Sequence, residues 1–340
     1  MQTHASLDAA KYGGLVLPDV MNKIWDISGF PLPFTDLCQK GSHNNRRVEF
    51  TVAELAAPVT SNAVVDGADV DVDNSKLAER QGNFTQISVK EVKVSDQVNA
   101  ANSIGNVGKL SYQISERQKE LRRDVEAQML THQASVAGDG ATVAGISAGI
   151  GAQLKTNVNV GATGTVGGFN STTGLFAAPS AGTKRALSEK TIRDVLQLVY
   201  ESGGNTQLLM ARPTVIRAMS EYLFTSTARV ATLTSTTASP DRRPMTAVGA
   251  VNVFVTDFGQ TVEMRDNRLQ PVDTATVSSM YFLDPSYLKQ SLMKGYTTDP
   301  LAKTGLAEKL LMSVHYSMLV LNEKSQGAIL DIDEAIAMVA

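Results

Sequence analysis

Residues Lys109–Ala134, KLSYQISERQKELRRDVEAQMLTHQA, predict one long helix, and the rest of the chain is best interpreted around it. Apolar side chains recur in this stretch at helical spacing and form a single stripe made of Leu110, Ile114, Leu121, Val125 and Met129. The remaining faces carry charged side chains: Glu116, Lys119, Glu120, Arg122, Arg123 and Glu126. A helix of about 25 residues is roughly 38 Å long, which is longer than one compact core needs. The stretch therefore predicts a spine helix with a solvated charged face.

Two strand signals precede this helix. Apolar and polar side chains alternate over Arg47–Val52, and a matching signal covers Phe84–Ser95. The apolar phase changes within the second signal, which predicts a bulge near Lys90–Glu91. The residues between the two strands are polar, acidic and small. We therefore expect a hairpin that projects from the body. Because a hairpin cannot bury its faces on its own, a neighbouring subunit is its natural cover.

The residues after the helix change character twice. Gly138–Thr183 holds 11 of the 26 glycines and only two charged residues, which indicates loops and short strands. An alternation of helices and strands then begins at Ser188, a good N-cap residue, and predicts a layered sheet domain. Its helices are expected at 188–203 and 213–223, its strands at 207–211, 251–257 and 279–283, and a Ser/Thr-rich loop at 225–246.

A last long strand is predicted at Ala307–Asn322. One of its faces is apolar throughout, and the other is polar in the middle and apolar at its ends. We expect the long helix to cover part of this second face. Pairing of so late a strand with the helix region would make the domain discontinuous in sequence.

Composition and charge exclude several classes of protein. Hydrophobic residues make up 43% and charged residues 19%, which argues against wholesale disorder. The net charge of −3 lacks the basic excess of a DNA-gripping module. The chain has a single cysteine, Cys38, so an intrachain disulfide is impossible. Neither a signal peptide nor an apolar stretch of membrane-spanning length is visible, and we expect assembly in the cytosol.

The residue types that carry chemistry are scattered. His4, His43, His132 and His315 have no second histidine at helical spacing and no cysteine pair nearby, so we predict no metal site. His315 on a strand face and Cys38 in the N-terminal segment are interpreted as structural residues. With no acid–base pair visible, no catalytic residue is predicted, and an enzyme is the least favoured class of function.

Three segments resemble ligand-binding motifs but lack residues that each motif requires. The segment 105–109 ends in Gly-Lys, but its spacing is short for a phosphate-binding loop and Leu110 replaces the required Ser or Thr. The segment 161–168 has the glycines but no lysine. Asp69, Asp71 and Asp73 match the first positions of a calcium loop, but Arg80 stands where a bidentate glutamate is needed. We therefore predict no cofactor, and an acidic solvated loop at these aspartates.

The order of the predicted elements resembles the Hong Kong 97-type capsid fold of tailed bacteriophages. Ser115–Glu126 (SERQKELRRDVE) is similar to a spine-helix pattern in a podophage-type branch of major head proteins. Further similarities, in the same order, lie at 200–204 (YESGG), 255–259 (VTDFG), 301–305 (LAKTG) and 321–324 (LNEK). Together they span about residues 46–330. One departure is Gly138–Gly151, which lacks the arginine-bearing segment expected before the next domain and leaves the path of 138–183 open.

The resemblance implies an α+β fold with a defined division of the chain. An N-terminal arm would occupy 1–45 and a projecting hairpin 46–95. A peripheral domain would contain 96–185, with the spine helix, and 301–340, with the returning strand. An axial domain would contain 186–300, with loops that meet at the centres of pentamers and hexamers.

The resemblance also implies a function. The chain would be a major capsid protein that self-assembles into an icosahedral shell around phage double-stranded DNA, in the cytoplasm of a bacterial host. Its partners would be further copies of itself, with scaffold, portal and decoration proteins as further possibilities and without sequence-specific DNA binding or a membrane. The alternative is an encapsulin-like cellular compartment built on the same fold.

Overall fold

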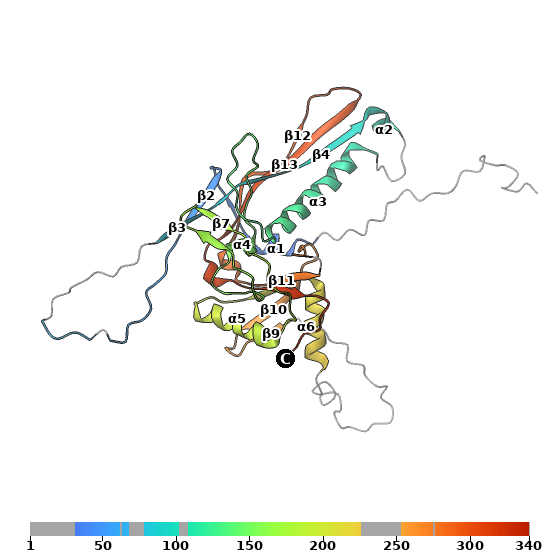
Figure 1. Cartoon of the computed structure of the whole chain (residues 1–340). Coiled ribbons are helices and arrows are strands. Elements are labelled where there is room, and N and C mark those ends of the chain that lie inside the picture. The colour runs from blue at the N-terminus through green and yellow to red at the C-terminus, as the bar shows by residue number, and fades with distance from the viewer. Residues whose placement is uncertain are drawn as a thin grey trace, which may run out of the picture.

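The structure is a computed structural model that describes residues 31–61, 63–67, 78–101, 108–225 (backbone only for 223–225), 253–274 and 276–339. Two main sheets, one of four strands and one of six, organise these residues. Figure 1 shows the four-stranded sheet and the long helix α3 at one end of the molecule, with α5 and α6 at the other. The predicted mixture of helices and sheets is confirmed. None of the described helices is both long and apolar enough to span a membrane.

The four-stranded sheet joins strands from distant parts of the chain. Its order is β1 (Gln39–Ser42), β12 (Leu288–Pro300), β13 (Ala307–Val320) and β4 (Gln86–Ser95). β13 pairs antiparallel with both β12 and β4, and β1 pairs parallel with β12. The predicted late strand is thus confirmed, and it pairs with β4, the strand that precedes the long helix in sequence.

The spine helix α3 spans Leu110–Met129 and is shorter than predicted at its C-terminus. Leu130 has left the helical region (φ −91°, ψ 4°), and the hydroxyl of the next residue, Thr131, donates to the carbonyl of Gln128. The short helix α2 (Asp96–Ala100), which the periodicity does not reveal, precedes it and is capped by Ser95. Leu121, Val125 and Met129 are fully buried, as the apolar stripe predicts.

The face of β13 that the spine helix covers differs from the prediction. Met312, Val314 and Tyr316 share a core with Leu121 and Val125 of α3. The helix therefore packs on the continuously apolar face of the strand, because that face offers it the larger apolar area. On the opposite face, Ser317 and Leu319 are nevertheless buried.

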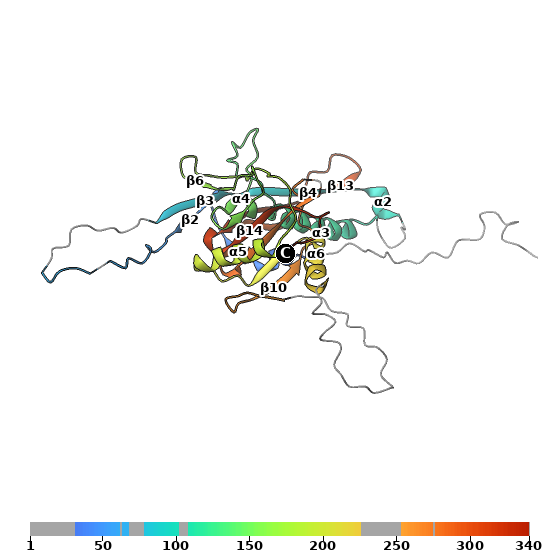
Figure 2. The same cartoon turned by 60° about the horizontal axis from the view of Figure 1, so that its bottom comes forward.

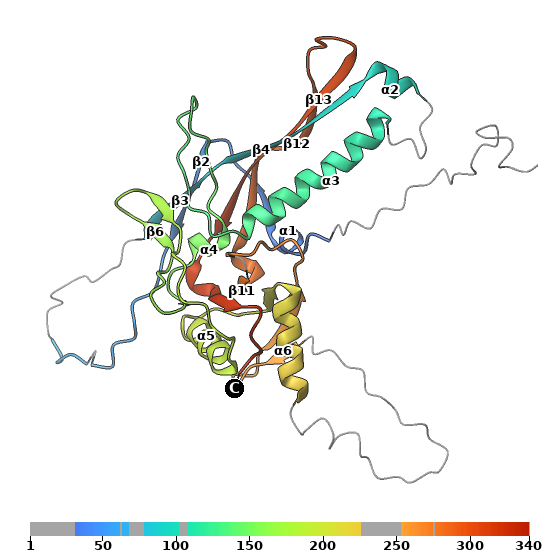
Figure 3. The same ribbon diagram turned by 45° about the vertical axis from the view of Figure 1, so that its right-hand side comes forward.

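The six-stranded sheet lies beside this core. Its order is β5 (Val158–Asn159), β14 (Gly327–Asp333), β11 (Val277–Leu283), β8 (Leu208–Ala211), β10 (Thr261–Asp266) and β9 (Val253–Val255). Helices α5 (Glu189–Glu201) and α6 (Pro213–Thr225) share a core with one face of this sheet. Figure 3 shows the two helices next to one another below β11.

The start and end of α5 follow the prediction closely. Ser188 Oγ accepts a hydrogen bond from the backbone N–H of Thr191 at 3.2 Å, which makes it the N-cap. The helix ends before Gly203, which adopts φ +86° and so permits the left-handed turn that follows. The predicted apolar face is buried and consists of Ile192, Val195, Leu196 and Val199. In α6, Val215 and Met219 are buried as predicted, whereas the side chain of Leu223 and the loop 226–246 lie outside the described residues.

The other face of the six-stranded sheet joins the core of the spine helix. Leu208, Met210, Tyr281 and Leu283 belong to the same buried cluster as Val125. The two sheets therefore share one core. The sheets do not divide the chain at the expected end of the axial domain, residue 300. The strand β12, inside the expected axial domain, lies in the four-stranded sheet. The strands β5 and β14, outside it, lie in the six-stranded sheet. Strand pairing across the whole chain, rather than order in sequence, decides this division.

The hairpin uses a different second strand from the one predicted. β2 (Arg47–Val52) pairs antiparallel with β3 (Glu79–Phe84), whereas 86–95 forms the separate strand β4. Figure 2 shows β2 and β3 reaching out on the side of the molecule opposite to α2. The predicted bulge near Lys90–Glu91 is wrong, since β4 pairs with β13 in continuous register. The irregular register lies instead in β12, between Leu292 and Thr297.

The N-terminal segment is more ordered than the predicted arm. Residues 1–30 lie outside the described residues, but Pro33–Leu37 form the helix α1, which is followed by β1. Phe34 is completely buried, so this part of the chain belongs to the core. The glycine-rich stretch holds short elements, as predicted: α4 (Ile150–Gln153), β5, β6 (Gly168–Asn170) and β7 (Leu175–Ala177).

Candidate functional site

The most exposed apolar surface of the described chain lies on the hairpin. Residues 53–61 and 63–67, which continue from β2, are all exposed. Leu55 is 92% exposed, Val59 67%, Val64 82% and Val65 80%. No other part of the described chain covers these side chains. An apolar surface of this kind on a projecting segment is typical of an interaction site.

The base of the hairpin is fixed firmly to the body by Asn83 of β3. Its amide Nδ2 donates to the carbonyl of Met318 in β13 at 2.6 Å, and its Oδ1 accepts from the backbone N–H of Ala148 at 2.9 Å. Asn83 is completely buried. It therefore joins the hairpin to the glycine-rich stretch and to the long strand. Nearby, the Lys324 ammonium lies 2.7 Å from the Glu54 carboxylate.

The outer face of the four-stranded sheet is a second uncovered surface. Side chains of β4 alternate, so that Val92 and Val94 point into the core while Ile87 (59% exposed) and Val89 (52%) point away from α3. The change of phase within 84–95 therefore reflects two apolar faces of one regular strand. A groove of about 540 Å³ begins here, between the loop 140–145 on one side and Ile87, Met293 and His315 on the other.

His315 forms part of one wall of this groove. Partial burial lowers the pKa of His315 below its ordinary value, and the nearby Lys294 ammonium lowers it further. The prediction that His315 is a half-buried strand residue agrees with its intermediate exposure. Asp139 holds the loop at the other wall, since its carboxylate accepts the N–H groups of residues 141–143. A hydrogen bond from the Thr142 hydroxyl, together with these backbone hydrogen bonds, holds the pKa of Asp139 well below its usual range.

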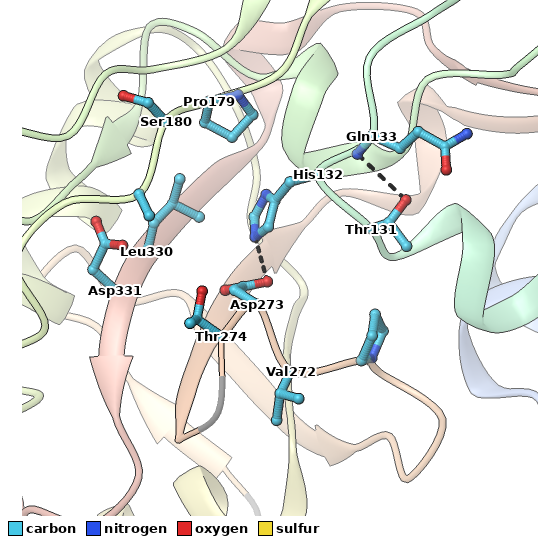
Figure 4. Close-up of a pocket in the computed structure, with 12 residues that line it drawn as sticks. Thr131, His132, Gln133, Pro179, Ser180, Val272, Asp273, Thr274, Leu330 and Asp331 are labelled. Atoms are coloured by element: carbon cyan, nitrogen blue, oxygen red, sulfur yellow. Dashed lines mark hydrogen bonds and ion pairs between the residues drawn. The ribbon is translucent and has the colours of Figure 1, made fainter.

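A smaller cavity of about 300 Å³ lies at the end of the spine helix, beside His132. Figure 4 shows the imidazole directed at Asp273, with Leu330 and Asp331 of β14 on another wall. The Nε2 atom of His132 lies 2.7 Å from Asp273 Oδ1 and 2.9 Å from the hydroxyl of Ser279. Sequence inspection does not reveal this cluster, because His132 lies 147 residues before Ser279 in the chain.

This cluster does not have the geometry of a nucleophilic site. A nucleophile–base–acid triad needs the hydroxyl on one imidazole nitrogen and the carboxylate on the other. Here both contact Nε2, and Ser279 Oγ donates its own proton to Asp273 at 2.5 Å. Ser279 is also completely buried. The other nitrogen, Nδ1, packs against Gly151, where a Cβ would lie 2.0 Å away. The cluster therefore ties the end of α3 to β11.

The other histidines and the cysteine considered in the sequence do not come together in one site. His43 bonds to Ser291 and Thr85, and Cys38 is buried. His4 and the three aspartates 69, 71 and 73 lie outside the described residues. Within the described ranges, no group of three His, Cys, Asp or Glu side chains is arranged to hold a metal ion.

One charged residue of the spine helix lies in the core, contrary to the prediction of a solvated charged face. Glu126 is not on a solvated face; it is completely buried. Its carboxylate accepts hydrogen bonds from Phe34 N at 2.8 Å and from Asn267 Nδ2 at 2.8 Å. Its position in the sequence offers a weak signal, because Glu126 directly follows the buried Val125 and lies at the margin of the apolar stripe.

A spine helix beside a four-stranded sheet, a shared core and an uncovered hairpin are the layout of the Hong Kong 97-like fold. Solved structures agree. A chain from a structure of Mycobacterium phage Bobi is similar with a TM-score of 0.59 at 12% identity, over 97% of this chain and 99% of that one. The SrpI encapsulin of Synechococcus elongatus is similar with a TM-score of 0.56 at 11% identity, over 99% of each chain.

Sequence comparison then identifies the family. Residues 2–333 match the SU10 major capsid protein family, and the chain belongs to that family. The major capsid protein of Escherichia phage Phieco32 is 23% identical over 331 residues, which cover 87% of this chain and 89% of that protein. The predicted identity as a phage major capsid protein is confirmed, and the family match favours it over the encapsulin alternative.

Proposed function

We propose that copies of this chain assemble, as pentamers and hexamers, into an icosahedral shell that encloses phage double-stranded DNA in the host cytoplasm. The observation that carries this proposal is the uncovered hairpin with its four exposed apolar side chains. A second copy is the partner that a self-assembling subunit meets at every contact of its shell. The hairpin of one subunit would then lie on its neighbour.

The energetics favour assembly through many weak contacts. Full burial of one such side chain is worth about 1.5–3 kcal/mol. Loss of rotational and translational freedom offsets much of this gain when two subunits meet. A closed shell repeats the contact around every subunit, so stability accumulates only in the assembled state. The exposed apolar hairpin can therefore stabilise the shell although each single contact is too weak to hold two free subunits together.

Charge supports a container rather than a DNA-binding module. The net charge of −3 provides no general attraction to the DNA backbone. The shell would hold DNA by enclosure. We propose no cofactor, metal or catalytic residue, and the scaffold, portal and decoration proteins of such a particle would be its further partners. The four-stranded region would form the peripheral domain, and α5, α6 and their sheet the axial domain.

Electron microscopy of the purified full chain tests the proposal. We expect closed shells in negative stain for the wild-type protein. The triple variant Leu55→Ser, Val64→Ser, Val65→Ser should remain folded but should sediment as unassembled subunits. A matched control with Val272→Ser, which is 39% exposed elsewhere, should still form shells. Normal shells from the triple variant would refute the role of the hairpin. Particles from infected cells that contain an enzyme in place of DNA would favour the encapsulin alternative.

A further inference from the structure

Residues 32–42, called the strap below, connect the N-terminal region to the core. The strap contains α1 and β1 and places Leu32, Phe34 and Cys38 among buried residues, with exposures of 8%, 0% and 4%. Phe34 and Cys38 belong to the cluster around the spine helix. The strap is thus a short segment whose burial depends on contacts with residues far away in the sequence.

A buried carboxylate holds the first turn of the strap. The side chain of the N-cap residue Leu32 offers no hydrogen-bond acceptor to α1, and Pro33 has no N–H. The two N–H groups that follow, of Phe34 and Thr35, donate to the Glu126 carboxylate at 2.8 and 2.7 Å. The Thr35 hydroxyl donates to the same carboxylate. Glu126 therefore replaces the missing capping side chain from a position 91 residues further along the chain.

The same carboxylate is fixed from its other side. Asn267, directly after β10, donates from Nδ2 to Glu126 Oε1 at 2.8 Å. Both Glu126 and Asn267 are buried, at 0% and 1% exposure. A buried carboxylate is costly unless hydrogen-bond donors surround it, and here the strap supplies three of the four donors. The charge of Glu126 and the docking of the strap therefore stabilise one another.

The second half of the strap covers a sheet edge. β1 is the outermost strand of the four-stranded sheet and pairs in parallel with residues 289–292 of β12. Lys40 Nζ adds a hydrogen bond to Gln290 Oε1 at 2.8 Å. Without β1, this edge of β12 would have no partner strand among the described residues. An open edge with free N–H and C=O groups invites pairing with another chain.

We propose that the strap is a detachable edge cover, and that the buried Glu126 carboxylate is the latch that keeps it closed. While the latch holds, residues 289–292 of β12 in an unassembled subunit have a partner strand on this edge. When the latch is released, Phe34 and Cys38 leave the core, and residues 289–292 at the edge of β12 become available to an extended segment of a second copy. This device does not depend on the proposed geometry of the shell.

Cys38 allows the latch to be tested in the unassembled full-length protein, because it is the only cysteine of the chain. The experiment measures the rate at which a thiol reagent labels Cys38 in native buffer. Glu126→Gln keeps the size of the side chain but removes one acceptor oxygen and the charge. We expect it to raise the labelling rate by about ten- to a hundredfold. Glu120→Gln, on the same helix but with a side chain that is 38% exposed, should label at the wild-type rate.

Low urea separates opening of the strap from global unfolding. Labelling through a local opening should depend little on urea, whereas labelling through global unfolding should rise steeply with it. If Glu126→Gln labels at the wild-type rate, or labels only in proportion to global unfolding, the latch is refuted. Should that variant fail to fold, Thr35→Val removes one donor on the strap side. It should raise the rate by about three- to tenfold, and an unchanged rate would also refute the latch.

Hydrogen exchange tests the edge cover independently. In Glu126→Gln, amides of residues 39–42 and 289–292 should exchange faster than in Glu120→Gln, while those of α5 should not change. Faster labelling of Cys38 with unchanged exchange at 289–292 would mean that α1 detaches while β1 stays paired with β12. That result would overturn the edge-cover part of the proposal.

Discussion

Tyr200 and Phe258 stack face to face, with ring centroids 4.9 Å apart and ring planes 4° apart. Tyr200 lies in the last turn of α5 and Phe258 in the turn between β9 and β10, so the contact joins two of the sequence motifs, 200–204 and 255–259. Arg193 Nη1 holds the same turn, 3.0 Å from each carboxylate oxygen of Asp257. Both rings remain more than 40% exposed, at 46% and 42%.

This stack should contribute measurably to stability. A double-mutant cycle with Tyr200→Ala and Phe258→Ala should give a coupling free energy of about 0.5–1.5 kcal/mol in urea unfolding. A control cycle that pairs Tyr200→Ala with Tyr287→Ala, an exposed tyrosine beside β12, should give none. Coupling of equal size in both cycles would show that the effect does not come from the stacked rings.

Removal of the Asn83 side chain should destabilise the whole body. Asn83→Ala leaves the buried carbonyl of Met318 and the buried N–H of Ala148 without this partner. We expect the free energy of unfolding to fall by about 2–4 kcal/mol. Gln81→Ala, two residues earlier on β3, removes only a hydrogen bond to the exposed Glu79 and should change it by less than about 0.5 kcal/mol. Equal effects of the two substitutions would contradict the role assigned to Asn83.

Substitutions on the two faces of β4 should lower the stability by different amounts. Val92→Ala and Val94→Ala create space in the core and should each cost about 1–3 kcal/mol of stability. Ile87→Thr and Val89→Thr alter the exposed face and should each cost less than about 0.5 kcal/mol in the unassembled subunit. Thermal and urea unfolding measure both. A large loss at Ile87 would mean that the outer face is covered within one chain.

Burial of Cys38 predicts a loss of stability in alkaline solution. Burial raises the pKa of this thiol from 9.0 to about 12 in the folded protein. Between these values the unfolded chain loses a proton that the folded chain keeps, so the free energy of unfolding falls as pH rises above 9. The slope from this one group approaches about 1.4 kcal/mol per pH unit.

Cys38→Ala isolates this contribution, because the buried tyrosines titrate equally in both proteins. Urea unfolding at pH 8, 9 and 10 should show a shallower decline for Cys38→Ala than for the wild type. Identical slopes would show that the thiol ionises as readily in the folded protein as in the unfolded chain.

Much of the hairpin surface could be predicted from sequence, but its anchoring could not. The alternation at Arg47–Val52 and the long loop after it correctly indicate a projecting strand. The prediction of a polar loop missed its exposed apolar side chains, such as Leu55 and Val64. The choice of its partner failed because Glu79–Phe84 (ERQGNF) has no apolar alternation and pairs through its backbone. Asn83 gave no signal either, since an asparagine buried by distant partners looks like any loop asparagine in the sequence.

The sequence by itself determined the elements whose periodicity is local. The apolar stripe of α3, the cap at Ser188 and the alternation along β13 all depend on residues within a few positions of one another. Tertiary structure decided what each element packs against. It placed β12 and β14 in different sheets, turned Ile87 and Val89 outward, and buried Glu126 under a segment 91 residues earlier in the chain. Strand pairing and the burial of a charged side chain depend on contacts between residues that are distant in sequence. The local spacing of residue types does not specify those contacts.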